Sequence, residues 1–184
     1  FGASGRNGGQ VVNSYSRDVD VIEQRYGKQT AQMLGSMMFE GAEIIRDRID
    51  RYAIACDYRP GGIFAALNQR QMGHLRSQQA SWARYGNSDL ELLDERGIRR
   101  EVATDRYVGG LLDRRGGHLH PLNLALGEAE AIRRHGGRIY EQSAALAVTY
   151  GAPNRVKTAQ GEVSATFVIF AGNAYLPSQL EPRL

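Results

Sequence analysis

The sequence predicts an α/β fold with an α+β insertion. Three observations support this: a glycine-rich segment opens the chain, long helical patterns lie towards both ends, and short strands bounded by glycine and proline gather in the middle. A nucleotide-binding α/β part is therefore expected from residues 1–52 and 117–184. Residues 53–116 are expected to form an inserted antiparallel sheet with helices.

Composition narrows the classes of protein to consider. Of the 184 residues 42% are apolar and 23% charged, which is ordinary for a globular protein. No apolar run approaches the roughly eighteen residues that a membrane-spanning helix needs, so no membrane span is expected. The net charge of +3 is small and no basic run alternates with aromatic residues, so nucleic acid is not an expected partner. Cys56 is the only cysteine, which favours the reducing cytoplasm.

Two helices are expected in the first part of the chain. Ser16-Arg17-Asp18 supplies capping residues for a helix that runs to Tyr26 and is interrupted by Gly27. Between Lys28 and Tyr52, apolar residues recur at steps of three and four, which predicts a long amphipathic helix with one buried face. Three methionines of this helix are expected in the core: Met33, Met37 and Met38.

The inserted part is expected to contain three strands and two helices, each bounded by turn residues. In order, the expected elements are a strand at 63–67 after the turn 57–62, a helix at 69–85 ended by Gly86-Asn87, a strand at 90–93, a helix at 94–102 capped by Asp94, and a strand at 107–113 that is broken by Gly109-Gly110 and closed by 114–117.

The last part begins with a helix opened by Pro121, a position where the missing N–H costs nothing, and ended near His135 by a glycine pair. Three strands at 145–150, 155–159 and 162–165 are expected to form an antiparallel meander. Further strands are expected before it at 138–141 and after it at 166–170. Because Thr166–Phe170 is continuously apolar apart from its first residue, we expect it to be covered on both faces.

The segment Gly2–Gln10 carries the strongest functional signal. Its four glycines leave the backbone open to close approach by a ligand. Hydrogen-bonding side chains stand between and after them, and one of these, Arg6, adds a permanent positive charge. An anion such as a pyrophosphate suits this combination. A flexible glycine-rich end is the alternative.

Gly2–Gln10, followed by Val11-Val12-Asn13-Ser14, resembles the loop after the second strand of the cofactor domain in FAD-dependent amine oxidoreductases of the D-amino-acid-oxidase type. The resemblance extends over essentially all residues. It implies a partial FAD-binding, Rossmann-like domain interleaved with a substrate domain of antiparallel sheet plus helices. Because both ends look cut, an internal fragment of a larger protein is expected.

The resemblance also implies an activity. FAD would accept a hydride from a C–H bond beside a substrate nitrogen, and the amine, of gamma-glutamyl type, would give an imine and then an aldehyde. Dioxygen would reoxidise the flavin and give hydrogen peroxide. The alternatives are an oxidase or dehydrogenase of another amine or N-methyl amino acid, and a non-redox module that binds a nucleotide or anion.

The expected cofactor contacts are carried over from the same resemblance. Arg6 and Asn7 are expected to be the main polar contacts, while Gly8 and Gly9 let the backbone pass close to the flavin. For Ala145, expected at the adenine, an ordinary strand residue is an equal alternative. The full set is Ser4, Gly5, Arg6, Asn7, Gly8, Gly9, Gln10, Ala145, Ala171, Gly172 and Asn173.

Four residues are candidates for the substrate pocket. Arg59 beside Tyr58 suits bidentate binding of a substrate carboxylate, with a solvated arginine as the alternative. His118 and His120 lie where the chain crosses between the expected domains; exposed turn histidines are the alternative. No cluster with metal-ligand spacing accompanies them, so no metal is expected. Nothing in the sequence fixes the distance between the carboxylates of Asp113 and Glu101, so they are not assigned as an acid–base pair, and no catalytic residue is assigned.

Overall fold

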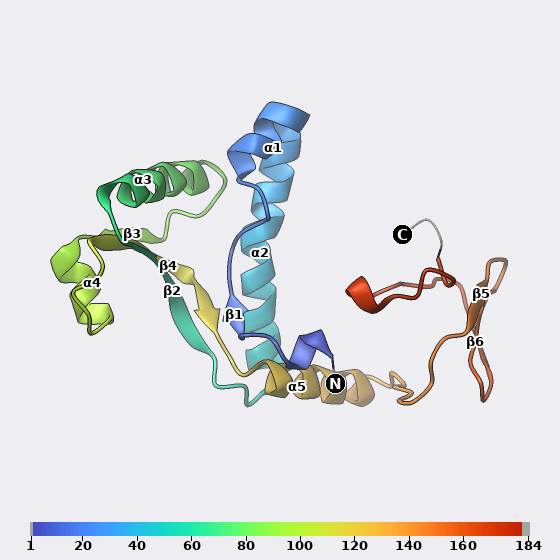
Figure 1. Cartoon of the computed structure of the whole chain (residues 1–184). Helices are drawn as coiled ribbons and strands as arrows, with labels where there is room; N and C mark the ends of the chain where they lie inside the picture. Colours follow the sequence, from blue (N-terminus) through green and yellow to red (C-terminus); the bar gives the residue numbers. More distant parts are fainter. Residues whose placement is uncertain (1, 182–184) are drawn as a thin grey trace. The chain divides into compact units, whose positions relative to one another are not determined.

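The computed structural model describes residues 2–181, which fall into two compact units divided between Gly136 and Gly137 (Figure 1). The first unit contains all of the first two expected segments and the beginning of the third. The division into cofactor-domain segments 1–52 and 117–184 and a substrate-domain segment 53–116 therefore stays a prediction.

The first unit is built on a four-stranded antiparallel sheet whose central strand is β4, Gly109–His118. β2, Arg59–Ala66, pairs along one edge of β4 and has an irregularity between Pro60 and Gly62. The other edge is shared by β3, Leu90–Leu93, and the very short β1, Gln10–Val11. The glycine-rich segment is thus joined directly to the inserted sheet.

Two strand boundaries differ from the predictions. β4 is not broken at Gly109-Gly110 and does not close at 114–117, because the glycines pair with Ala66 and Ala65 of β2 and the strand continues to His118. Similarly, β2 begins at Arg59 rather than Ile63. In both cases pairing with a neighbouring strand outweighs the local preference of glycine for turns.

Helices form where the apolar spacing predicts them. They are α1, Val19–Tyr26; α2, Lys28–Tyr52; α3, Gln69–Arg84; α4, Glu95–Glu101; and α5, Pro121–Arg134, while a short 3₁₀ helix η1 covers Ala3–Gly5. Side chains cap three of them: Asn68 accepts from the Gln71 amide at 3.0 Å, Asp94 from the Gly97 amide at 2.7 Å, and His120 from the Asn123 amide at 3.2 Å.

The core lies between these helices and the sheet. Trp82 of α3 packs edge-on against Phe39 of α2 and Phe64 of β2, with ring centroids 5.6 and 5.8 Å apart. Met38 is buried in this cluster as predicted. The prediction is wrong for Met33 and Met37, which are more than half exposed because they lie on the outer side of α2.

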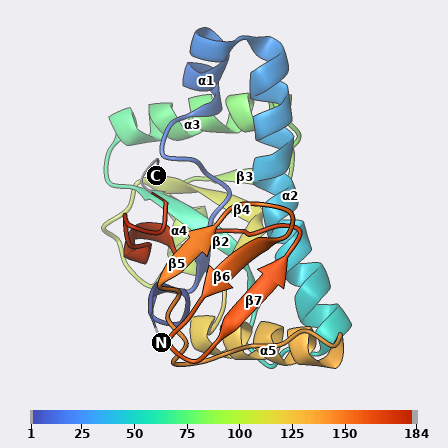
Figure 2. The ribbon, with the colours of Figure 1, turned by 90° about the vertical axis from the view of Figure 1, so that its right-hand side faces the viewer.

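The second unit contains the expected meander (Figure 2): β5, Ala147–Thr149; β6, Asn154–Lys157; and β7, Glu162–Ala165, all antiparallel, followed by the 3₁₀ helix η2, Asn173–Tyr175. The predicted strands at 138–141 and 166–170 are wrong. Phe167 and Ile169 are 83% and 88% exposed, because no strand among residues 2–181 pairs with that run.

None of the helices within residues 2–181 is both long enough and apolar enough to cross a membrane.

Candidate functional site

The glycine-rich segment is an ordered loop held by its own side chain Asn7. The Asn7 Nδ2 atom donates to the carbonyl oxygens of Ala3 and Ser4, each at 3.0 Å, and Oδ1 accepts from the Gly9 amide at 2.8 Å. Expected as a cofactor contact, Asn7 also fixes the conformation of the loop. This second role leaves no signal in the sequence beyond the general preference of asparagine for turns.

The loop is anchored at Gly9, where it meets the residues between β4 and α5. The Leu119 amide donates to the Gly9 carbonyl at 2.9 Å. Gly9 is buried with a φ of 68°, and a Cβ atom there would stand 2.0 Å from the Leu119 carbonyl oxygen. Gly8 is exposed, and nothing lies within 4 Å of its ideal Cβ position. Gly9 is therefore required by packing, whereas Gly8 offers open backbone.

Three predicted site residues from distant parts of the chain form a row across the sheet. His118 of β4 is the register partner of Gln10 on one side and of Arg59 on the other. Directly paired residues of antiparallel strands place their side chains on the same face, with Cβ atoms about 4.5–5.5 Å apart. This polar row, Gln10–His118–Arg59, joins the loop to the candidate substrate residues.

A cavity of about 660 Å³ lies between the loop and the sheet. Five of its lining residues are glycines: Gly8, Gly61, Gly62, Gly116 and Gly117. Side chains that can carry charge come from Glu101, Asp113 and His118. Much of its wall is thus bare peptide, against which a planar ring system can lie, and FAD fits that chemistry.

A smaller cavity of about 380 Å³ adjoins the same loop and also borders α2. Ser4, Asn7 and Gly9 contribute to it, together with apolar residues of α2 such as Met38 and Ile45. Gln10 lines both cavities. Loop residues that are expected to hold the cofactor therefore line cavities on two sides of the loop.

Asp113 is 2% exposed and accepts three hydrogen bonds. Its Oδ2 atom accepts from Asn13 Nδ2 at 2.8 Å, and its Oδ1 atom accepts from Asn87 Nδ2 and from the Arg115 amide, each at 3.0 Å. Glu101 lines the same cavity, but these hydrogen bonds already occupy Asp113. The sequence alone does not reveal this cluster, because its members are far apart in the chain.

The other candidate residues have structural contacts. The Tyr58 hydroxyl donates to the Gly116 carbonyl at 3.2 Å, and His120 caps α5 through Nδ1, which accepts from the Asn123 amide at 3.2 Å. Cys56 is 1% exposed, as expected for a packed residue, and burial raises the pKa of its thiol. The substrate roles of Tyr58 and His120 stay predictions.

Four expected cofactor residues belong to the second unit. Ala145 is half-buried and precedes β5, while Ala171 is exposed. Gly172 is half-buried next to Leu176, and Asn173, with a φ of 48°, begins η2 and accepts from the Ala174 amide at 2.6 Å. Their cofactor roles also stay predictions.

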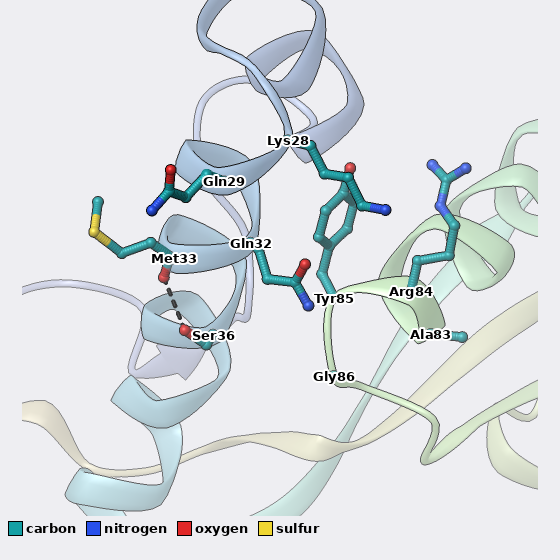
Figure 3. A pocket seen from close by; sticks show the side chains of 9 residues that line it. All are labelled: Lys28, Gln29, Gln32, Met33, Ser36, Ala83, Arg84, Tyr85 and Gly86. Carbon is teal, nitrogen blue, oxygen red and sulfur yellow. Dashed lines mark hydrogen bonds between the residues drawn. The ribbon is translucent and has the colours of Figure 1, made fainter.

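Another hollow, of about 810 Å³, lies between α2 and the end of α3 (Figure 3) and contains none of the predicted site residues. Arg84 at its rim is paired with Asp20, and the Tyr85 hydroxyl donates to Glu23. Within residues 2–181, no group of three or more His, Cys, Asp or Glu side chains is arranged to hold a metal ion.

Comparison with known proteins gives consistent results. The family described as FAD dependent oxidoreductase (DAO) matches residues 1–184. The chain is 65% identical over 184 residues to gamma-glutamylputrescine oxidoreductase of Escherichia coli and 39% identical over 178 residues to the probable oxidoreductase OrdL of Haemophilus influenzae. It covers 43% and 41% of these two relatives, so it spans less than half of their length.

A solved structure with the same fold is that of glycine oxidase from Geobacillus kaustophilus. The TM-score is 0.69 at 19% sequence identity, over 99% of this chain and 48% of that one. The expected fold class, part of an FAD-binding fold combined with helices and antiparallel sheet, is thereby confirmed.

Proposed function

Because the chain belongs to the FAD dependent oxidoreductase (DAO) family, whose cofactor is FAD, we propose that the whole protein oxidises an amine of gamma-glutamylputrescine type. The products are an imine, which water hydrolyses to an aldehyde, and hydrogen peroxide from dioxygen. The identity of 65% to gamma-glutamylputrescine oxidoreductase supports this choice of substrate.

The glycine-rich loop holds the cofactor in this proposal. Arg6 supplies a permanent charge for an anionic group of FAD, and Gly8 supplies open backbone at the cavity. Gly9 and Asn7 keep the loop in shape through contacts within the protein. Further contacts are proposed from other residues of this loop, Ser4, Gly5 and Gln10, and from residues of the second unit: Ala145, Ala171, Gly172 and Asn173.

When bound, FAD supplies the acceptor for the hydride removed from the carbon beside the substrate nitrogen. The chain's own residues recognise the substrate. Arg59, at the end of the polar row, binds the carboxylate of a gamma-glutamyl group through two parallel hydrogen bonds. Asp113 and Glu101 give the cavity a negative potential that attracts a cationic amine.

The observation that carries the proposal is the glycine-lined cavity shared by the loop and the sheet, in a chain of this family. The test uses the full-length protein: record its visible absorption spectrum, then measure peroxide release with gamma-glutamylputrescine, putrescine and N-methyl amino acids. A flavin spectrum with peroxide formed fastest from gamma-glutamylputrescine supports the proposal. Reduction of a dye without peroxide indicates a dehydrogenase, and the absence of flavin indicates a non-redox module.

Arg59→Ala sharpens the substrate assignment. The variant is expected to raise KM for gamma-glutamylputrescine about tenfold or more, the value of one charge-assisted hydrogen bond, and to leave KM for putrescine unchanged because putrescine has no carboxylate. An equal effect on both substrates contradicts the role of Arg59.

The proposal includes the cytoplasm as the location. It is supported by the presence of Cys56 as a buried free thiol, which is compatible with a reducing compartment.

A further inference from the structure

We propose that Asp113 is a positioning residue for the cofactor loop, acting through Asn13 and held in turn by Asn87. The inference rests on the proposed function, because it takes Gly2–Gln10 as the loop that binds FAD. It assigns to the four-stranded sheet an influence on the affinity for FAD that acts through the position of the loop.

The three side chains form a buried polar cluster. Asn13, Asn87 and Asp113 are 1%, 0% and 2% exposed. They come from the segment after β1, the turn after α3, and the middle of β4. Asn13 and Asp113 are 100 residues apart in sequence, yet Asn13 Nδ2 lies 2.8 Å from Asp113 Oδ2. Such a contact fixes the path of the chain immediately after the loop.

The cluster depends on the negative charge. None of the ion pairs between residues 2 and 181 includes Asp113, so N–H donors alone stabilise the buried carboxylate. Burying a charge without such donors is strongly unfavourable. Each amide donor therefore makes a charge-assisted hydrogen bond, roughly twice as strong as a neutral one.

The loop needs this support because its strand is so short. β1 has only two register pairs with β4, Gln10 with His118 and Val11 with Gly117. Beside them, a Cβ atom at Gly116 would stand 3.0 Å from the Val11 carbonyl oxygen and 3.3 Å from Asp113 Oδ2. The carboxylate and the backbone of Val11 thus pack around one glycine.

Loss of this contact lowers the fraction of molecules whose loop is ready to bind. The apparent Kd of a ligand equals its intrinsic Kd divided by the fraction of molecules whose site is already ordered, so a smaller fraction means weaker binding. Removing one hydrogen bond to a charged group should therefore weaken FAD binding about tenfold to a hundredfold.

The experiment exchanges the two groups in the full-length protein. Asn13→Asp sets two carboxylates against each other, and Asp113→Asn sets two amides together. In the double variant N13D/D113N, the carboxylate introduced at position 13 accepts from the amide introduced at position 113. The oxygen of that new amide still accepts from Asn87 and from the Arg115 amide, as the native carboxylate does.

Asp89→Asn is the matched control for this exchange. It makes the same chemical change, from a carboxylate to an amide, at a side chain that is 58% exposed. Because that side chain lies outside the buried cluster, its replacement leaves the contact between Asn13 and Asp113 intact.

The readouts are the Kd for FAD, from flavin fluorescence on titrating the apoprotein, and its Tm. Each single variant should bind FAD at least tenfold more weakly, the double variant should bind it more tightly than either single variant, and Asp89→Asn should match the unmodified protein. Unchanged Kd in the single variants, or no recovery in the double variant, overturns the inference. So does a lower Tm with unchanged Kd, because the cluster would then only stabilise the fold.

If the single variants fail to fold, Asn13→Ala tests the same inference. It removes the contact on the loop side and leaves Asp113 with Asn87 and the Arg115 amide. Its Kd for FAD should rise about tenfold, and an unchanged Kd overturns the inference. An unmodified protein that binds no FAD instead contradicts the proposed function itself.

Discussion

Replacing Gly9 by alanine in the full-length protein tests the anchoring of the loop. The new Cβ atom would stand 2.0 Å from the Leu119 carbonyl oxygen and 3.2 Å from Pro121 Cδ. Because the nearest neighbour is backbone, no side-chain rotation relieves the clash. The loop must move, which breaks the hydrogen bond from the Leu119 amide to the Gly9 carbonyl.

The magnitude follows from two contributions. Alanine at a φ of 68° is strained by about 1–2 kcal/mol. The lost hydrogen bond and the displaced packing add about 1–2 kcal/mol. Together, about 2–4 kcal/mol corresponds to a loop fraction in the binding geometry that is about 30-fold to 700-fold smaller, at roughly 1.4 kcal/mol per factor of ten.

The assay titrates apoprotein with FAD and records Tm, with two glycine-to-alanine controls. Gly151→Ala should change neither value, because its nearest neighbour would be the Pro153 carbonyl oxygen at an ordinary 3.5 Å. Gly8→Ala should leave Tm unchanged and weaken FAD binding, because its Cβ would meet no protein atom and would stand at the cavity. Equal affinity for FAD in Gly9→Ala and Gly151→Ala refutes the reasoning.

Arg6, Tyr85 and the run Thr166–Phe170 can each be tested separately. Arg6→Ala in the full-length protein should weaken FAD binding by about 1.5–3 kcal/mol, and an unchanged Kd removes Arg6 from the site. The hydrogen bond to Glu23 raises the pKa of Tyr85 from 10.0 to about 12, so the folded state keeps a proton that the unfolded state loses. Stability should therefore fall as the pH rises from about 10 to 12, less steeply in Tyr85→Phe, as measured by urea unfolding; identical slopes would contradict this. Residues 1–184 alone should retain no FAD, because the exposed run Thr166–Phe170 has no strand partner among residues 2–181; a stoichiometric flavin spectrum would show otherwise.

Local features of the sequence predict the helices well. The bounds of α2, Lys28–Tyr52, follow from its apolar spacing and the preceding glycine, and β3, Leu90–Leu93, lies where turn residues bound it. Features that depend on pairing with a strand distant in the sequence are predicted poorly. The glycine pair in β4 has the local character of a turn, but β2 holds it in the sheet.

The same distinction applies to the site. The glycine-rich loop is recognisable because its residues are neighbours in sequence. The polar row and the buried cluster cannot be recognised in this way, because their members are distant in sequence. The folded chain brings Gln10 to His118, and Asn13 to Asp113. Asparagine and aspartate in isolation also suit exposed turns, so their types alone do not indicate burial.

The separation of 100 residues between Asn13 and Asp113 has a consequence for biosynthesis. At about 5–20 residues per second, the ribosome needs roughly 5–20 s to reach Asp113 after Asn13 has been made. During that interval the glycine-rich loop lacks the strand on which it docks. If the loop holds the cofactor as proposed, loading must wait until β4 has emerged from the ribosome, so the loop becomes competent only well after its own residues have been translated.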